Sequence, residues 1–207
     1  MKKITELFLT RLNPIAWWGV AIAAWAVSRV SQVWLDSFYD RSKFPVPFYV
    51  GQTTFDAAEL KGYYAHMINE GTLGIYVQTQ LVDFVFMAAS FVFLLILAGT
   101  ALRTLPAAIR ESKFGNFAKA MLWVMPLAPV FDAIENLTSF VMLANPQDFA
   151  YWLVYPYSSF AVVKFALFGL GYLWALSSVF ILMGYGLWTG VRKLFGGKGA
   201  QISVSVR

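Results

Sequence analysis

The sequence predicts an all-α integral membrane protein, a four-helix transmembrane bundle with a short amphipathic helix in the first outer loop. The composition supports this prediction, because 59% of the 207 residues are hydrophobic and only 13% are charged, against about 25% in soluble domains. The apolar residues also fall into four runs, near residues 14–35, 79–102, 118–144 and 157–190. At about 1.5 Å of rise per residue, each run is long enough to cross about 30 Å of hydrocarbon as an α-helix.

The first run begins at Asn13 and Pro14, a sequence typical of a helix start. Asn can cap the helix, and Pro at the first helical position lacks only an N–H that would be unpaired anyway. The basic N-terminus and the small residues Ala21 and Ala23 also suit a cleaved signal peptide. We interpret the run as a retained span, because its apolar residues continue well beyond that position.

The segment between the first two runs, about residues 36–78, is too long to be a simple turn. Pro45 and Pro47 favour an extended path at its beginning. A helical pattern then runs from Asp56 to Ile68, and Gly71 is the expected C-cap. We therefore predict a short amphipathic helix that lies on the outer membrane surface or caps the bundle.

The last two runs contain features that bear on helix geometry. Pro126 and Pro129 predict a kink one turn before Asp132, which would open space beside the acidic side chains. The fourth run is longer than one crossing requires, so its cytoplasmic end is expected to tilt or project beyond the bilayer. Aromatic residues near the ends of the runs suggest interfacial belts: Trp17, Trp18, Trp34, Trp152, Tyr155 and Tyr157.

The basic residues predict the orientation of the chain. Eleven of the sixteen lie in the N-terminal arm, in residues 103–119 and in the tail, so both termini are expected in the cytoplasm of a multi-pass protein of the inner (plasma) membrane. We predict one domain, residues 1–195, and a flexible cytoplasmic tail, residues 196–207. The net charge of +5 is spread over loops rather than gathered on one soluble surface, so we expect the lipid bilayer and no nucleic acid as a partner.

Several chemistries are excluded or disfavoured by the residue types. The chain has no cysteine, which rules out disulfides and thiolate ligands. His66, the only histidine, would have to reach Asp132 or Glu135 to form a metal site, so we predict no metal and interpret His66 as solvated or interfacial. The sequence has no glycine-rich phosphate motif and no defensible Ser-His-Asp set. The aromatic content leaves a pigment or quinone open, and the sequence identifies no cofactor.

Six polar residues interrupt the apolar runs and form the candidate site. A charged side chain at the bilayer centre costs about 2.5–3.5 kcal/mol on insertion scales, so such residues are expected to face inward and meet each other. The spacing of Asp132, Glu135 and Asn136 places them on one helical face, and Lys164 lies about 10 Å inside its membrane face by helical rise. All six fall towards the outer leaflet: Arg29, Asp83, Asp132, Glu135, Asn136 and Lys164.

Three functions fit this polar set. Its three carboxylates against two basic groups leave one negative charge in a partly desolvated space, which favours a pocket that binds a lipid-like ligand or a membrane protein partner. One alternative is an intramembrane enzyme or a proton-coupled carrier, in which Asp132 or Glu135 exchanges a proton and Lys164 or Arg29 orients an anionic group. Another is a structural subunit whose charges only lock helix packing. Association into a homo-oligomer also stays open.

Residues 50–140 combine three elements: the stretch from Phe55 to Tyr76, Asp83 early in the second run, and the Asp-x-x-Glu-Asn element that begins at Asp132. In these elements the chain resembles an uncharacterised group of small bacterial inner-membrane proteins with four predicted spans. The chain departs from that group just before Tyr76, where Gly74 and Ile75 replace the usual basic residue. The resemblance implies the topology and a shared polar site, and it implies no reaction, because the group has no assigned activity.

Overall fold

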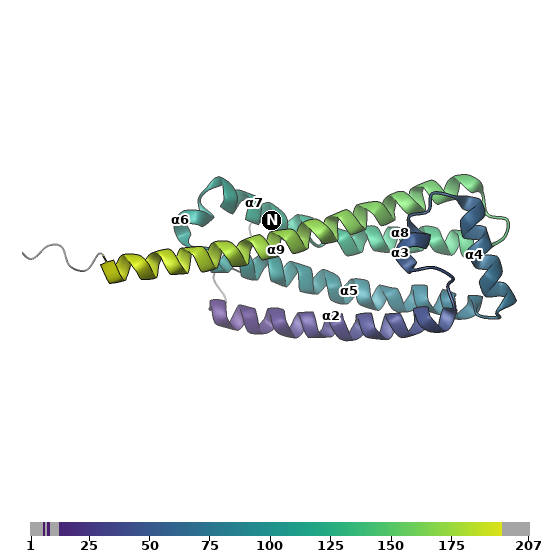
Figure 1. Ribbon diagram of the computed structural model, residues 1–207, viewed down its shortest axis with the longest axis horizontal. Helices are drawn as coiled ribbons and strands as arrows, with labels where there is room; N and C mark the ends of the chain where they lie inside the picture. Colours follow the sequence, from purple (N-terminus) through teal and green to yellow (C-terminus); the bar gives the residue numbers. More distant parts are fainter. Residues whose placement is uncertain (1–5, 7, 9–12, 196–207) are drawn as a thin grey trace, which may run out of the picture.

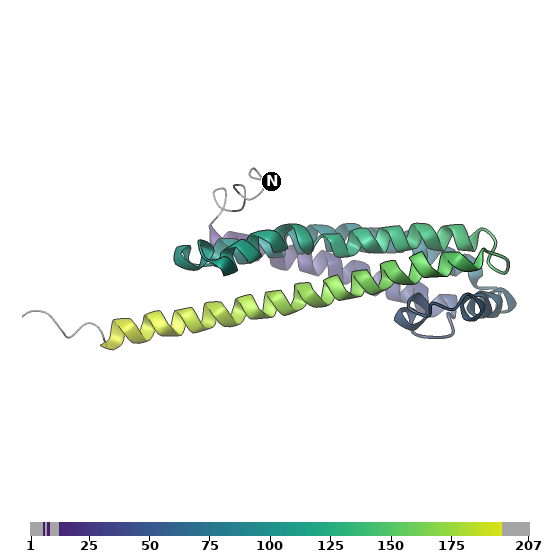
Figure 2. The ribbon, with the colours of Figure 1, turned by 90° about the horizontal axis from the view of Figure 1, so that it is seen from above.

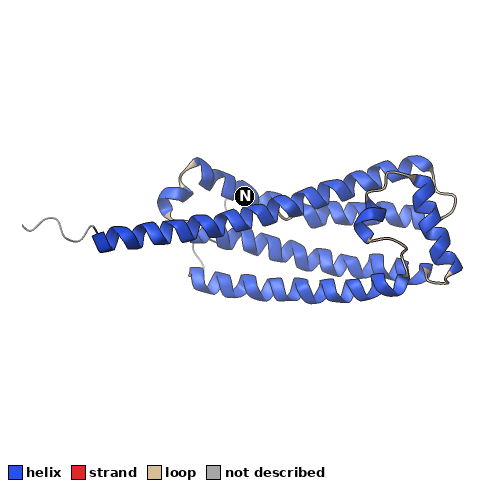
Figure 3. Ribbon diagram, viewed as in Figure 1, coloured by secondary structure: helices blue, strands red, loops and turns tan. Residues whose placement is uncertain are grey.

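The computed structural model describes residues 6, 8 and 13–195, and no strand occurs among them. Long helices run roughly side by side (Figures 1 and 3), which confirms the predicted all-α class. Within the described residues, three helical stretches are long and apolar enough to cross a membrane, namely Leu73–Thr104, Lys113–Leu143 and Tyr151–Arg192. They correspond to the second, third and fourth predicted runs, whereas the first run is not among them.

The first run forms α2 (Pro14–Ser42), which begins as predicted and ends later. Asn13 Oδ1 accepts a hydrogen bond from the backbone N–H of Ala16 at 2.8 Å, and Lys43 ends the helix in the left-handed conformation with φ 53°. The helix continues beyond residue 35 because its buried stripe goes on to Ser42. Its partner is α5 (Leu73–Thr104), and the hydroxyls of Ser28 and Ser90 share a hydrogen bond of 3.0 Å between the two helices.

The third run is interrupted near the position where Pro126 predicts a kink. It forms α7 (Lys113–Val124) and α8 (Leu127–Leu143), with Met125 and Pro126 between them. Pro129 lies in the first turn of α8, where its missing N–H removes no hydrogen bond within the helix. Before α7, α6 (Ala107–Arg110) completes the connection from α5.

The fourth run forms α9 (Val154–Phe195), which follows the short 3-10 helix η1 (Tyr151–Leu153). The first part of α9 packs along α8, and α8 also contacts α5. Further along, α9 diverges from the other helices and extends past their ends (Figures 1 and 2). Unlike the pairs α8–α9 and α5–α8, α2 and α9 hardly contact each other.

Two short helices cross the end of the bundle at which α2 ends and α9 begins (Figure 1). In the segment for which the sequence predicts an amphipathic helix, the structure has α4 (Ala57–Asn69). Asp56 caps it by accepting the N–H of Ala58 at 2.8 Å, and Gly71 follows it with φ +69°. The sequence did not predict α3 (Phe48–Gln52), which lies directly after Pro47. We call this side of the molecule the α4 end.

Some aromatic residues do not lie where the sequence predicted them. Tyr157 is fully buried instead of interfacial, and Trp17 is 8% exposed, whereas Trp152 and Tyr155 are exposed. Several predictions concern residues outside the described part of the chain, namely the charges of Lys2, Lys3 and Arg11 and the tail 196–207.

Candidate functional site

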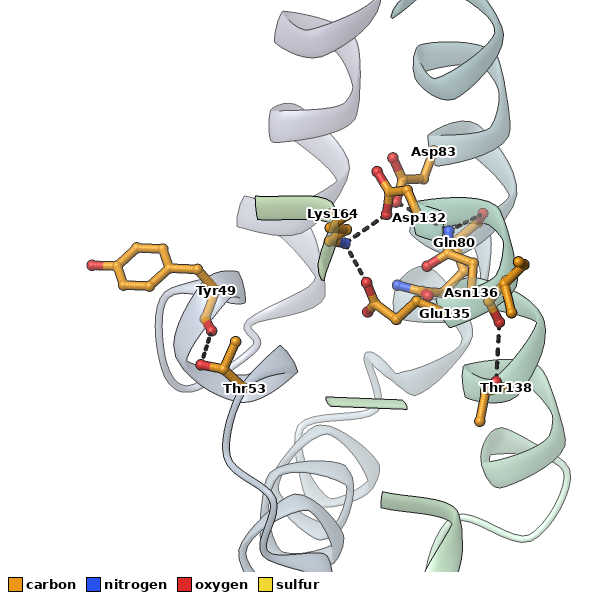
Figure 4. A network of polar contacts seen from close by, with 10 residues as sticks. Tyr49, Thr53, Gln80, Asp83, Asp132, Glu135, Asn136, Thr138 and Lys164 are labelled. Atoms are coloured by element: carbon orange, nitrogen blue, oxygen red, sulfur yellow. Dashed lines mark hydrogen bonds and ion pairs between the residues drawn. The ribbon is translucent and has the colours of Figure 1, made fainter. Parts of the chain in front are cut away.

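Five of the six predicted polar residues meet inside the bundle (Figure 4). Asp83 comes from α5, the three residues of the Asp-x-x-Glu-Asn element come from α8, and Lys164 comes from α9. All five are buried. We call Asp83, Asp132, Glu135, Asn136 and Lys164 the polar cluster.

Lys164 connects α9 to α8 within this cluster. Its Nζ lies 2.5 Å from Asp132 Oδ1 and also forms an ion pair with Glu135 (Figure 4). The spacing of Asp132 and Glu135, three residues apart on α8, lets one ammonium contact both carboxylates. The ion pairs therefore fix the register of α8 against α9.

Asn136 connects α8 to α5 in the same way. Its Nδ2 donates hydrogen bonds to Asp83 Oδ2 at 3.0 Å and to the backbone carbonyl of Gln80 at 3.3 Å. Asp83 has no ion-pair partner among the residues that the structure describes. The polar cluster thus joins three helices and contains three carboxylates for one lysine.

Arg29 is the one predicted site residue that the structure does not bring into this cluster. Its side chain is exposed, and it forms no hydrogen bond or ion pair with any described residue. The buried positions of α2 include Ser28, Ser31 and Leu35, and a residue next to Ser28 is rotated from that stripe by about 100°. The cluster consequently has a surplus of two carboxylates, rather than the surplus of one that the sequence suggested.

A cavity of about 290 Å³ opens beside the polar cluster. Asp83, Asp132 and Lys164 line it together with two amides, Gln32 and Gln52. Its remaining walls are apolar and mostly aromatic: Leu35, Tyr39, Phe48, Phe86, Phe165, Phe168 and Tyr172. This combination of a few convergent polar groups and aromatic walls is typical of small-molecule sites.

Three further cavities continue from this one, and neighbouring cavities share lining residues. Towards the α4 end, a cavity of about 500 Å³ shares Tyr39 and Phe48 with it. In the other direction, a cavity of about 50 Å³ that includes Arg29 shares Phe168 and Tyr172, and an apolar cavity of about 350 Å³ follows beyond Tyr172. The row lies along α2, α5 and α9, and we call it the α2/α9 groove.

No family model, curated protein or solved structure matches this chain. The resemblance to small four-span proteins therefore stays an expectation from the motif residues. The candidate site rests on its own geometry.

Several buried polar atoms around the cluster have no hydrogen-bond partner among the described residues. They include Gln52 Oε1, both polar atoms of the Gln80 side chain, and Asn136 Oδ1. Buried polar groups in folded proteins are nearly always hydrogen-bonded. Gln52 lines the cavity beside the cluster, so its side-chain amide is a candidate contact for a molecule bound there.

The site also contains residues that the sequence pattern did not assign to it. Tyr157 is buried close to Glu135, and its position seven residues before Lys164 on the same helix is a spacing that indicates a shared face. Gln52 and Tyr39 line the cavity. Gln52 lies on the unpredicted helix α3, so no sequence pattern pointed to it.

Polar contacts organise the first half of α4 and connect its C-terminal end to α2. The Glu59 carboxylate accepts hydrogen bonds from Thr54 and Tyr63, which lower its pKa. Desolvation and the neighbouring Glu59 raise the pKa of Tyr63 to about 12. Lys43 lies 2.7 Å from Glu70 and lowers the pKa of that carboxyl. The Lys43–Glu70 ion pair therefore connects the C-terminal end of α4 to the end of α2, whereas the Glu59 hydrogen bonds stay within residues 54–63.

The carboxylates of the polar cluster contact Lys164 and Asn136. Across residues 6, 8 and 13–195, no group of three or more His, Asp or Glu side chains is arranged to hold a metal ion. His66 is exposed on α4, away from the buried carboxylates. Binding through hydrogen bonds and charge, next to an apolar groove, is the chemistry that the site offers.

Proposed function

We propose that this protein is a four-span inner-membrane protein that binds a lipid-like amphiphile in the α2/α9 groove. The polar head lies beside the polar cluster, and the apolar chain runs along the groove away from the α4 end. The observation that carries the proposal is the row of cavities, which is polar and charged at one end and apolar at the other.

The proposed topology counts α2 as the fourth span. α2 packs along α5, and Thr100 on α5 donates a hydrogen bond to the Trp17 carbonyl near the start of α2. Because α5 is long and apolar enough to cross a membrane, a helix packed along it lies at the same depth. With both termini cytoplasmic, as the basic residues favour, the α4 end faces outward.

The groove suits a chain-like ligand for two reasons. Contact between α2 and α9 is slight at most, so the groove is open sideways towards lipid. Its apolar cavity is lined by Trp18, Ala101 and Ala175. Along α9, Ala175 lies about the thickness of one membrane leaflet from Lys164 of the polar cluster. An amphiphile entering from the membrane can therefore leave its chain in apolar surroundings while its head reaches polar groups.

A structural role for the charges is the second hypothesis with a specific observation in its favour. The polar cluster ties α5, α8 and α9 together, and such networks can fix helix register without any ligand. This role is compatible with amphiphile binding, because Asp83 and Asp132 form part of the cavity wall as well.

The proposal is tested by filling the apolar end of the groove. Ala175 lines the apolar cavity, so Ala175→Phe should occupy the space of the ligand chain. We expect binding of a sixteen-carbon amphiphile to weaken about tenfold, because about two buried methylenes at about 0.8 kcal/mol each lose their place. Native mass spectrometry of the detergent-solubilised protein measures the bound fraction.

Ser177→Phe is the matched control, because Ser177 lies on the same helix, is exposed and lines none of the four cavities of the groove. This variant should bind the amphiphile as the unchanged protein does. Circular dichroism and size-exclusion profiles establish that both variants fold. Equal binding by the two variants, with both folded, would overturn the proposed groove.

A further inference from the structure

We propose that the head of the bound amphiphile is cationic, an ammonium group held between Asp83 and the aromatic wall of the cavity. The inference rests on the proposed function and names the chemical class of ligand for the same site. Its basis is a carboxylate without a cation, an acceptor without a donor, and aromatic rings around both.

Asp83 supplies the charge for this interaction. It lines the cavity, it is 3% exposed, and its only hydrogen bond among the described residues comes from the neutral amide of Asn136. Lys164 is occupied by ion pairs with Asp132 and Glu135. A buried carboxylate is costly unless it is paired, so an ammonium beside Asp83 would supply the missing partner.

Gln52 is a second, independent indication, because it belongs to a different element. It is 3% exposed on α3, lines the same cavity, and its Oε1 accepts no hydrogen bond from the described residues. The Asp83 carboxylate and the Gln52 oxygen, which is unpaired among the described residues, are both acceptors on residues that line the cavity. A head that donates hydrogen bonds and carries positive charge matches them.

The aromatic walls favour the same charge. Phe48, Phe86 and Phe168 line the cavity on three different helices, and the faces of aromatic rings attract cations within about 6 Å of their centroids. Lys164 Nζ already lies 5.1 Å from the centroid of the Phe165 ring. These rings can surround an ammonium and the first methylenes of its chain.

The positive charges near the groove do not reverse this balance. Lys164 faces two carboxylates, and Arg29 lines the adjoining cavity rather than the one that contains Asp83. Even when Arg29 is included, three carboxylates stand against two basic groups. A phosphate or carboxylate head in the cavity would meet Asp83 and Asp132 at close range, and in low dielectric that repulsion is strong.

The test compares ligands of equal chain length that differ only in their heads. Hexadecylamine, hexadecanol and hexadecanoate compete at pH 7 for the protein in a neutral maltoside detergent, and native mass spectrometry reports each bound fraction. We expect the amine to bind about tenfold more tightly than the acid, because the amine makes a charge-assisted contact with Asp83 whereas the acid is repelled by it. Asp83→Asn should abolish the preference for the amine.

Asp148→Asn is the control for net charge, because Asp148 is exposed on the loop before η1 and lines none of the groove's cavities. It should keep the preference. Equal binding of the three heads, tighter binding of the acid, or an amine preference that survives Asp83→Asn would overturn the cationic head while the groove stands. Failure of all three chains to bind would overturn the groove as well.

A separate arm of the same experiment tests whether the ammonium belongs to a lipid headgroup or to a free amine. Lysophosphatidylethanolamine presents the ammonium on a lipid headgroup, and lysophosphatidylglycerol is its counterpart without one. Displacement of hexadecylamine by the first and not by the second assigns the ammonium to a headgroup. If neither lysolipid displaces hexadecylamine, the ammonium belongs to a free amine. Each of these two results supports the cationic head. Equal displacement by the two lysolipids would contradict it.

Discussion

At the scale of single residues, Lys164 holds the polar cluster together, because the ion pairs of Asp132 and Glu135 both end on its ammonium. We predict that Lys164→Met destabilises the protein by about 3–5 kcal/mol, since two buried carboxylates lose their partner. Adding Asp132→Asn and Glu135→Gln to this variant should restore most of the lost stability. Thermal unfolding in detergent measures this, with the exposed Lys113→Met as a control. A triple variant less stable than Lys164→Met alone would contradict the pairing.

The residues of this cluster could be predicted because depth and helical phase agreed for them. Asp132, Glu135 and Asn136 share one face of α8, and each is buried. Arg29 has a suitable depth but a different phase, since it adjoins the buried Ser28 without lying on the same stripe. Depth alone does not decide which way a side chain points on a helix whose small residues, such as Ala23 and Ala26, leave several faces equally apolar.

At the scale of elements, the turn between α6 and α7 depends on Gly115. A Cβ at this position would lie 2.0 Å from the backbone oxygen of Arg110, a contact that a side-chain movement cannot relieve. We predict that Gly115→Ala destabilises the protein by about 1–3 kcal/mol. Gly62→Ala in α4, where nothing lies within 4 Å of the new Cβ, should instead stabilise by about 0.5–1 kcal/mol. Thermal unfolding of both variants measures these changes. A melting temperature that shifts in the same direction in both variants would contradict the steric explanation.

The elements that the sequence predicted well are those with strong local determinants. Asn13 and Pro14 begin α2, Asp56 caps α4, and Gly71 ends it. The structure adds α3, a helix of five residues directly after Pro47. A helix this short has too few residues to show an apolar period, and its stability comes from packing against α9. The cavity wall that contains Gln52 was therefore beyond prediction from the sequence.

At the scale of the whole molecule, the number of spans decides which surface faces the cell exterior. The chain contains no cysteine, so single cysteines can be labelled without background. With four spans, Gly62→Cys on α4 and Gln147→Cys before η1 should react with a membrane-impermeant maleimide in intact cells. Thr5→Cys and Glu111→Cys should react only after the membrane is opened, because the basic residues favour a cytoplasmic location for both segments.

Thr5 is the decisive position, because α2 lies between it and α4. If α2 does not cross the membrane, Thr5 and Gly62 lie on the same side and label together, and the bundle has three spans. If it does cross, Arg29, exposed near the middle of α2, lies at membrane depth. An arginine there is tolerated when its head reaches water or a polar group, and the cavity that it lines opens into the α2/α9 groove. Opposite labelling of Thr5→Cys and Gly62→Cys would thus place α2, Arg29 and the groove at membrane depth, and labelling on the same side would contradict the four-span topology on which the proposed groove depends.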